Sequence, residues 1–197
     1  MLFASFRTAS GIYGGCFNRF AAFVTGGQYC HSEFLFMWTE EEVQLALISC
    51  PNWLTMLKLS NPTFSQGSRV CVCVDVSWGG KVQYRLLETL ADDPYWQIPT
   101  TCSIHIPCSL QEEMALLKWL YRERNKDYDR FGALTSVVPL RRSQSQYDTY
   151  FCSQLMACGL QRILRFDNPA AETPNSLEAK LRSMYGSSNE TLEILQP

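Results

Sequence analysis

Histidine is nearly absent from this chain, which has two in 197 residues, His31 and His105. A histidine that exchanges protons near neutral pH must therefore be one of these two. The chain also lacks blocks of lysine and arginine, and its formal net charge is only -2. Such a balance is poorly suited to neutralising a row of phosphates, so we expect no nucleic-acid partner.

Long hydrophobic runs are missing as well. No stretch approaches the roughly 20 apolar residues that span a bilayer. The first residues, "MLFASFRTASGIYGG", have no basic leader and no long apolar segment before a small-residue cleavage site. We therefore expect a protein without a signal peptide or transmembrane segment, located inside the cell in the cytoplasm.

Cysteine is abundant, with nine residues, but the C-x-x-C spacing of zinc ribbons and redox motifs is absent. The odd number and the lack of an export signal predict free thiols in a reducing compartment. Cys71 and Cys73 lie two apart on a probable strand, where they share one face but are badly placed to bridge each other, so we interpret them as packing residues. We expect no cofactor and no metal, and a redox or metal protein is the least favoured class.

The hydrophobic pattern predicts one α+β domain over residues 1–197, with an antiparallel sheet flanked by helices and a flexible tail after about residue 186. "SEFLFMW", the turn "TEEE" and "VQLALISC" read as a β-hairpin. The capping-box patterns "SLQE" and "NSLE" predict the starts of two helices. The other expected elements are a short helix over 17–24 and strands over 69–78 and 102–107.

The most informative stretch is "YDTYFCSQLMACGLQRIL", residues 147–164. Its apolar residues recur at helical spacing, which predicts a helix packed on the core. Cys152 would lie in the first turn, with Asp148 or Thr149 as the cap. The unpaired amides of a helix start stabilise a thiolate, the form of cysteine that attacks carbonyl carbons.

His31 begins the strand that follows "GGQYC" and could serve Cys152 as a base. The rival histidine, His105, lies between two isoleucines on a strand and is better explained as a structural residue. The alternative hypothesis is a non-catalytic structural or partner-binding module, in which Cys152 and His31 only pack. An exposed aromatic surface with Trp53, Tyr95 and Trp96 would then matter more.

Four short motifs follow one another along the chain in this order: "YCHSEFLF", "DYDRFGAL", "YFCSQL" and "TPNSLEAKL". This ordered set resembles the circularly permuted branch of the NlpC-type papain-like superfamily, found in bacteriophages, bacteria and large DNA viruses and related to the lecithin:retinol acyltransferase group. In papain itself the cysteine comes first, whereas here the histidine does. The resemblance implies a permuted papain-like fold and a viral or phage-like protein, which could be carried in a virus particle.

The resemblance implies a cysteine hydrolase, that is, a thiol protease, amidase or acyltransferase acting on a peptide, amide or lipid-ester substrate. Cys152 would be the nucleophile and His31 the general base and acid. Gln154 departs from the pattern, because the branch has glutamate there. The sequence does not choose among the substrates.

The third catalytic residue is the least defined member of the site. Glu33 projects from the same strand face as His31 and is our candidate for orienting the ring or contacting substrate. Superfamily members often take this residue from the next strand instead. In the expected hairpin that strand offers Ser49, Cys50 or Asn52, none of which is a carboxylate or a histidine.

The oxyanion formed by thiolate attack needs hydrogen-bond donors. The backbone amide of Cys152 is the natural first donor, and the side chain of Tyr29 or Gln28 is a candidate for the second. Tyr128 and Asp129 match the tyrosine-aspartate pair of the branch, and we interpret both as structural, with the aspartate capping a turn.

Overall fold

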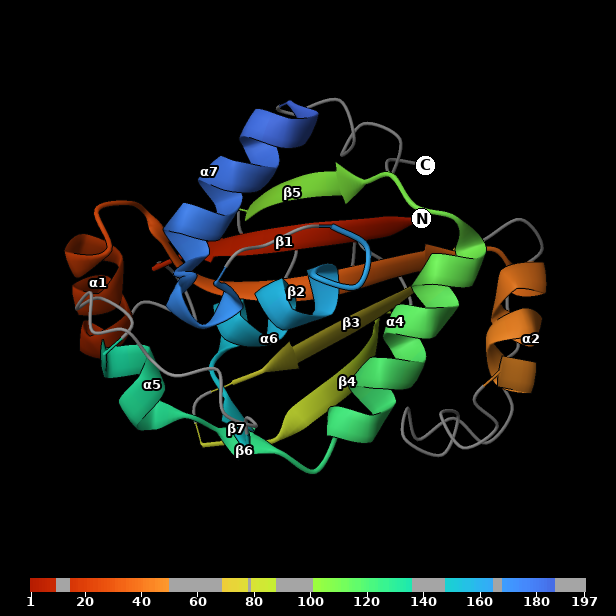
Figure 1. Ribbon diagram of the computed structural model, residues 1–197, viewed down its shortest axis with the longest axis horizontal. Helices are drawn as coiled ribbons and strands as arrows, with labels where there is room; N and C mark the ends of the chain where they lie inside the picture. The colour runs from red at the N-terminus through yellow and green to blue at the C-terminus, as the bar shows by residue number, and fades with distance from the viewer. Residues whose placement is uncertain are drawn as a thin grey trace.

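The computed structural model describes residues 1–9, 15–49, 69–77, 79–87, 101–135, 148–164 and 168–186. Its centre is a five-stranded antiparallel sheet with strand order β4-β3-β2-β1-β5 (Figure 1). The bounds of its strands are Leu2–Thr8 for β1, Tyr29–Trp38 for β2, Val70–Val76 for β3, Val82–Leu87 for β4 and Thr101–Ile106 for β5. The expected α+β class with an antiparallel sheet is therefore confirmed.

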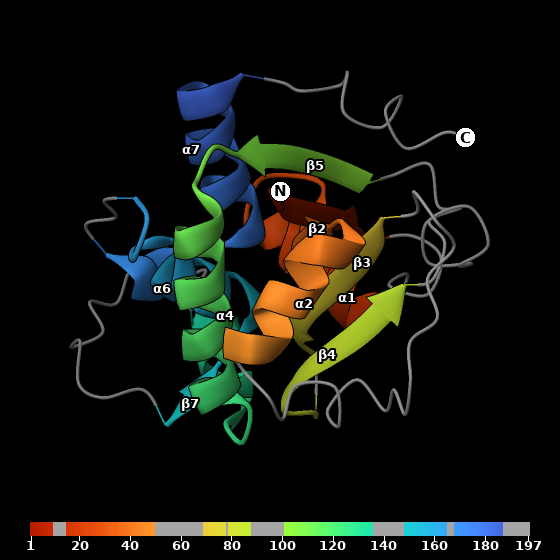
Figure 2. The same cartoon turned by 90° about the vertical axis from the view of Figure 1, so that its right-hand side faces the viewer.

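Six α-helices accompany the sheet among the described residues. They are α1 (Cys16–Val24), α2 (Glu40–Ser49), α4 (Leu110–Glu123), α5 (Arg130–Thr135), α6 (Cys152–Leu160) and α7 (Pro174–Tyr185). Figure 2 shows α4, α6 and α7 together on one side of the sheet. A parallel pair of two-residue strands, β6 (Asp127–Tyr128) and β7 (Thr149–Tyr150), and a 3₁₀ turn at Pro169–Ala171 complete the set. None of the described helices is long and apolar enough to cross a membrane.

Both faces of the central strands are buried, which explains the nearly continuous hydrophobic run of β2. Phe34 and Phe36 point into the larger core, where they meet Leu155 of α6 and residues of the other helices. Leu35 belongs to a smaller cluster on the opposite face, together with Cys73 of β3. A strand buried on both faces loses the apolar–polar alternation of a solvent-exposed strand.

The expected β-hairpin after β2 is wrong, because residues 40–49 form helix α2. The backbone N–H of Thr39 donates to Oε2 of Glu42 at 2.8 Å, and the N–H of Glu42 donates to Oγ1 of Thr39 at 3.3 Å. These two bonds form a capping box, and three acidic residues in the first turn favour the positive helix end. A short apolar run such as "VQLALIS" fits either a strand or a helix, and the cap decides between them.

The other expected elements are confirmed with adjusted bounds. Helix α1 and strands β3 and β5 coincide with the expected segments, and α4 begins at the Ser109–Glu112 capping box. Helix α7 begins earlier than "NSLE" suggested, because Thr173 and Ser176 form its capping box. Strand β1 was not expected from the sequence, although it lies beside β2 within the sheet. The tail after Gly186 is outside the described residues.

Candidate active site

Cys152 is the first residue of α6, as expected, but the helix is capped differently. The chain runs extended through β7, so Thr149 is paired with Asp127 of β6 and cannot cap the helix. Phe151 is the N-cap residue, and its backbone N–H donates to Oε1 of Gln154 at 3.4 Å. Gln154 therefore satisfies an amide at the helix start without adding negative charge beside the sulfur.

His31 of β2 and Cys152 of α6 are neighbours in the folded chain. A hydrogen bond joins the imidazole ring to the thiol, and each residue is only 5 % exposed. The backbone N–H groups of Ser32 and Ser153 also donate to the sulfur. Three hydrogen-bonding groups therefore define the position of the thiol: the amide of Ser153 at the helix start, the amide of Ser32 and the imidazole of His31.

Asp75 of β3 is the residue that orients His31. Its Oδ2 atom lies 3.1 Å from Nε2 of the ring, and both side chains are buried. Because each ring nitrogen makes one hydrogen bond in the ring plane, Nδ1 is the nitrogen left to serve Cys152. The order of contacts is thus thiol, imidazole, carboxylate, as in a catalytic triad.

The expectation that Glu33 orients His31 is corrected by this arrangement. Glu33 is buried and accepts a hydrogen bond from Nε of Arg7 at 2.7 Å, while its second oxygen lies 3.2 Å from Nη2 of Arg85. The cause is strand register, since β1 sets Arg7 opposite His31 and diagonal to Glu33 on the same face. Of the alternatives, Ser49 is the last residue of helix α2 rather than part of a neighbouring strand, and Cys50 and Asn52 lie outside the described residues.

Asp75, Arg7 and Arg85 are site residues that were not predicted from the sequence. In "RVCVCVDVSW" a single carboxylate interrupts a run of buried strand residues. A buried carboxylate needs a partner, so this position was a detectable signal. The identity of the partner was not detectable, because it depends on how β2 and β3 align.

The ionisation of the pair follows from its surroundings. Burial alone would raise the pKa of the Cys152 thiol, but the charge and hydrogen bond of His31 and the two backbone amides reverse this, and the pKa is lowered. Burial would lower the pKa of His31, yet the charge of Cys152 and the bond to Asp75 raise it to about 10. Both shifts favour the thiolate–imidazolium form of the pair over the neutral form.

Asp75 carries the negative charge that this state needs. Burial raises the pKa of its carboxyl, but the hydrogen bond and charge of His31 and the charge of Arg85 outweigh burial and lower it. Burial raises the pKa of Cys30, Cys108 and Cys158 to about 12. Cys152 is thus set apart from these thiols by its neighbours.

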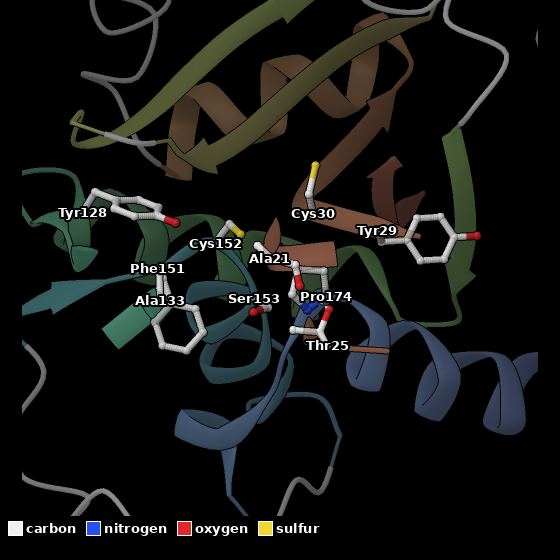
Figure 3. A pocket seen from close by; sticks show the side chains of 10 residues that line it. All are labelled: Ala21, Thr25, Tyr29, Cys30, Tyr128, Ala133, Phe151, Cys152, Ser153 and Pro174. Carbon is white, nitrogen blue, oxygen red and sulfur yellow. Dashed lines mark hydrogen bonds between the residues drawn. The ribbon is translucent and has the colours of Figure 1, made fainter. Parts of the chain in front are cut away.

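A pocket opens at Cys152 (Figure 3). Its described lining comprises Ala21, Thr25, Tyr29, Cys30, Tyr128, Ala133, Phe151, Cys152, Ser153 and Pro174. None of these described residues is an acid or a basic side chain. The pocket therefore suits an uncharged group next to the sulfur.

The two tyrosines of the pocket point in different directions. Figure 3 shows the hydroxyl of Tyr128 directed toward Cys152, whereas the ring of Tyr29 extends away from it. Tyr29 is thus badly placed as the second oxyanion donor, and Gln28 is exposed beside it. Of the two tyrosines, Tyr128 has the hydroxyl that is better placed to act near the sulfur.

Asp129 does have the expected structural role. Its Oδ1 atom accepts a hydrogen bond from the backbone N–H of Gly132 at 2.6 Å in the first turn of α5. Its own N–H donates to the carbonyl oxygen of Tyr150 at 2.8 Å. These two bonds tie α5 and β6 to the strand that precedes Cys152.

His105 lies elsewhere in the sheet. It is on β5, opposite Phe3 of β1, and the two rings are 5.3 Å apart between centroids. Burial lowers its pKa, and the N-terminal amino group lowers it further. The structure thus brings His31 to Cys152 and keeps His105 as a packing residue. Trp53, Tyr95 and Trp96 lie outside the described residues.

One group of side chains has the residue types of a metal site. Single ligand atoms of His31, Glu33 and Asp75 lie within 4.8 Å of one another. However, the guanidinium groups of Arg7 and Arg85 already contact these carboxylates. A divalent cation would have to displace the buried guanidinium of Arg7 and the partly buried one of Arg85, so the arrangement fits an ion-pair network better than a metal centre. Cys71 and Cys73 are buried, as expected, and the thiol of Cys73 also donates to Oε2 of Glu33 at 3.2 Å.

Comparisons of the chain with protein-family models, with curated proteins and with solved structures find no match.

Proposed function

We propose that this protein is a cysteine hydrolase or acyltransferase that works through an acyl-enzyme intermediate, with Cys152, His31 and Asp75 as its catalytic residues. The observation that carries the proposal is the contact order of sulfur, imidazole and carboxylate in a buried site. The histidine precedes the cysteine in the chain, as in the permuted papain-like arrangement. We include that arrangement in the proposal.

The chemistry follows from the ion pair. The Cys152 thiolate attacks the carbonyl carbon of an amide or ester and forms a tetrahedral intermediate. As the intermediate collapses, the protonated His31 gives its proton to the leaving amine or alcohol, and a thioester remains on Cys152. Neutral His31 then takes a proton from water or another acceptor, which attacks the thioester and releases the thiolate.

Two donors are available for the oxyanion of the intermediate. The backbone N–H of Cys152 belongs to the open first turn of α6, where amides lack helical partners. The hydroxyl of Tyr128 points toward the sulfur (Figure 3) and is the second donor. We therefore assign Tyr128 a catalytic role in stabilising developing negative charge.

The pocket favours a neutral acyl group over a charged one. Binding a substrate carboxylate beside the sulfur would require a cation, and the described lining residues include no lysine or arginine. Peptide, amide and lipid-ester substrates with an uncharged acyl part all meet this condition. The eight described cysteines are free thiols, which fits a reducing compartment such as the cytoplasm.

The experiment that tests the proposal has a chemical and a catalytic part. Brief iodoacetamide treatment at pH 6.5, read by peptide mass spectrometry, should label Cys152 far faster than Cys158 of the same helix. p-Nitrophenyl butyrate should give a burst of nitrophenol and a thioester on Cys152, while mono-p-nitrophenyl succinate, which carries a carboxylate, should react more slowly.

The matched controls are Cys152→Ala, which should abolish both reactions, and Cys158→Ala, which should preserve both. Equal labelling of Cys152 and Cys158 in the wild-type protein would contradict the proposal. Full biological function of a folded Cys152→Ala protein would favour a non-catalytic module.

A further inference from the structure

Behind the catalytic residues lies a chain of alternating charges, which runs Arg7, Glu33, Arg85, Asp75, His31. Arg7 contacts one oxygen of Glu33, and Nη2 of Arg85 lies 3.2 Å from the other. The same Nη2 lies 3.4 Å from Oδ2 of Asp75, which is the oxygen that binds His31. One guanidinium nitrogen therefore stands between two buried carboxylates.

We propose that Arg85 is a positioning residue of the site, which holds Asp75 against His31 by separating its carboxylate from that of Glu33. The inference rests on the proposed function, because it gives Arg85 the role of supporting the same three catalytic residues. Arg85 itself does not need to touch substrate. It acts through Asp75.

The need for a cation at this point follows from burial. Glu33 is 1 % exposed and Asp75 is 2 % exposed, and single oxygens of the two lie within 4.8 Å of each other. Two carboxylates this close in a buried site do not both stay ionised unless positive charge lies between them. Arg7 contacts Glu33 from β1, on the side away from Asp75, so it cannot replace Arg85.

The groups described around Asp75 agree with this role of Arg85. Strand β2 contributes His31 and Glu33, its own strand contributes Cys73, and β4 contributes Arg85 and the amide of Gln83. Cys152 of α6 acts on Asp75 only through His31. Among these groups Arg85 and His31 are the cations, and only Arg85 keeps its charge throughout the catalytic cycle, because His31 gives up its proton.

Removal of Arg85 should therefore act on the ionisation of Asp75. Without the guanidinium, the repulsion from Glu33 makes Asp75 hold a proton at neutral pH. A neutral Asp75 no longer stabilises the imidazolium, so His31 would lose its proton at lower pH and the Cys152 thiolate would form at higher pH. The effect passes through two residues before it reaches the sulfur.

The test compares Arg85→Met, Arg85→Lys and the double variant Glu33→Gln/Arg85→Met. Two readouts need no substrate. One is the pH dependence of iodoacetamide labelling at Cys152. The other is the NMR titration of the His31 ring, whose signals must be distinguished only from those of His105. In Arg85→Met we expect about tenfold slower labelling at pH 6 and a His31 titration about one pH unit lower. Arg85→Lys should stay close to the wild type.

The double variant provides the decisive comparison. Glu33→Gln removes the repelling charge, so it should restore labelling at pH 6 in the Arg85→Met background, although a second buried group has been changed. A purely structural role of Arg85 predicts the opposite, a further loss. Unchanged profiles in Arg85→Met, or no restoration by Glu33→Gln, would overturn the inference.

The side chain of Arg85 is 29 % exposed, so its replacement should be tolerated better than that of fully buried Arg7. If circular dichroism shows that Arg85→Met is poorly folded, Arg85→Gln can replace it, because it removes the same charge and keeps a polar side chain. A failure of the proposed function would look different. It would appear in the wild-type protein as a Cys152 that reacts no faster than Cys158.

Discussion

Asn175 of α7 and the backbone of Tyr29 are joined by two hydrogen bonds. Oδ1 of Asn175 accepts from the N–H of Tyr29 at 2.9 Å, and Nδ2 donates to the carbonyl oxygen of Tyr29 at 2.9 Å. The same Nδ2 also donates to Oγ1 of Thr25. The side chain of Asn175 thus fixes the backbone at the start of β2, two residues before His31.

Asn175→Ala should weaken both stability and catalysis. The loss of these bonds leaves backbone groups of Tyr29 poorly satisfied and should lower the free energy of unfolding by about 1–3 kcal/mol. Urea denaturation checks this value. Ester hydrolysis by the folded variant should be slower, because β2 no longer holds His31 as firmly. Ser183→Ala, at an exposed position of the same helix, is the control and should change neither.

Asp75→Asn and Glu33→Gln should separate orientation from anchoring. Asp75→Asn keeps the size of the side chain but loses the charge beside His31, so kcat/KM should fall by about a hundredfold or more. Glu33→Gln leaves buried Arg7 without its anion and should mainly lower the free energy of unfolding, by about 3 kcal/mol. Kinetics and urea denaturation of both variants check this. A larger catalytic loss in Glu33→Gln would return the orienting role to Glu33.

The pH dependence of ester hydrolysis should show a broad plateau. On the acidic limb activity rises with pH as the Cys152 thiol ionises, and the lowered pKa of Cys152 places this limb at lower pH than for an ordinary thiol. The raised pKa of His31 keeps the ring protonated until about 10, so activity declines as the pH passes that value. Measurement of kcat/KM across the pH range checks both limbs.

His31→Gln removes the positive charge that stabilises the thiolate. The pKa of Cys152 should then rise, because burial is no longer opposed, and labelling by iodoacetamide at pH 6 should slow by about a hundredfold or more. His105→Gln is the matched control. A drop in activity that follows His105 and not His31 would refute the pairing.

Tyr128→Phe tests the second oxyanion donor. Loss of the hydroxyl should reduce kcat by about a hundredfold. KM and the labelling rate of Cys152 should change little, because the ring and the ion pair remain. Tyr121→Phe, on α4, is the control for loss of a tyrosine hydroxyl. An unchanged kcat in Tyr128→Phe would leave the tyrosine with the structural role first expected for it.

Local patterns in the sequence determined most of the helices and strands of this protein. These patterns involve residues that are close together in the chain, so they can be recognised from the sequence alone. Examples are the Ser109–Glu112 cap, the helical spacing after Cys152 and the run of β-branched and cysteine residues around Cys71 and Cys73. The same patterns gave a wrong prediction where an apolar run fitted a strand and a helix equally well. Residues 43–49 became a helix because the Thr39–Glu42 cap, overlooked in the sequence, favours one.

The tertiary structure alone decided which charged groups meet. The sequence predicted Glu33, on the same strand, as the residue that orients His31, with a residue of the next expected strand as the alternative. In the structure the partner is Asp75 of β3, 44 residues away. Strand order and register set this contact, together with the placement of Glu33 between Arg7 and Arg85. Register is a property of the whole sheet, because a shift by one residue would turn every side chain to the other face.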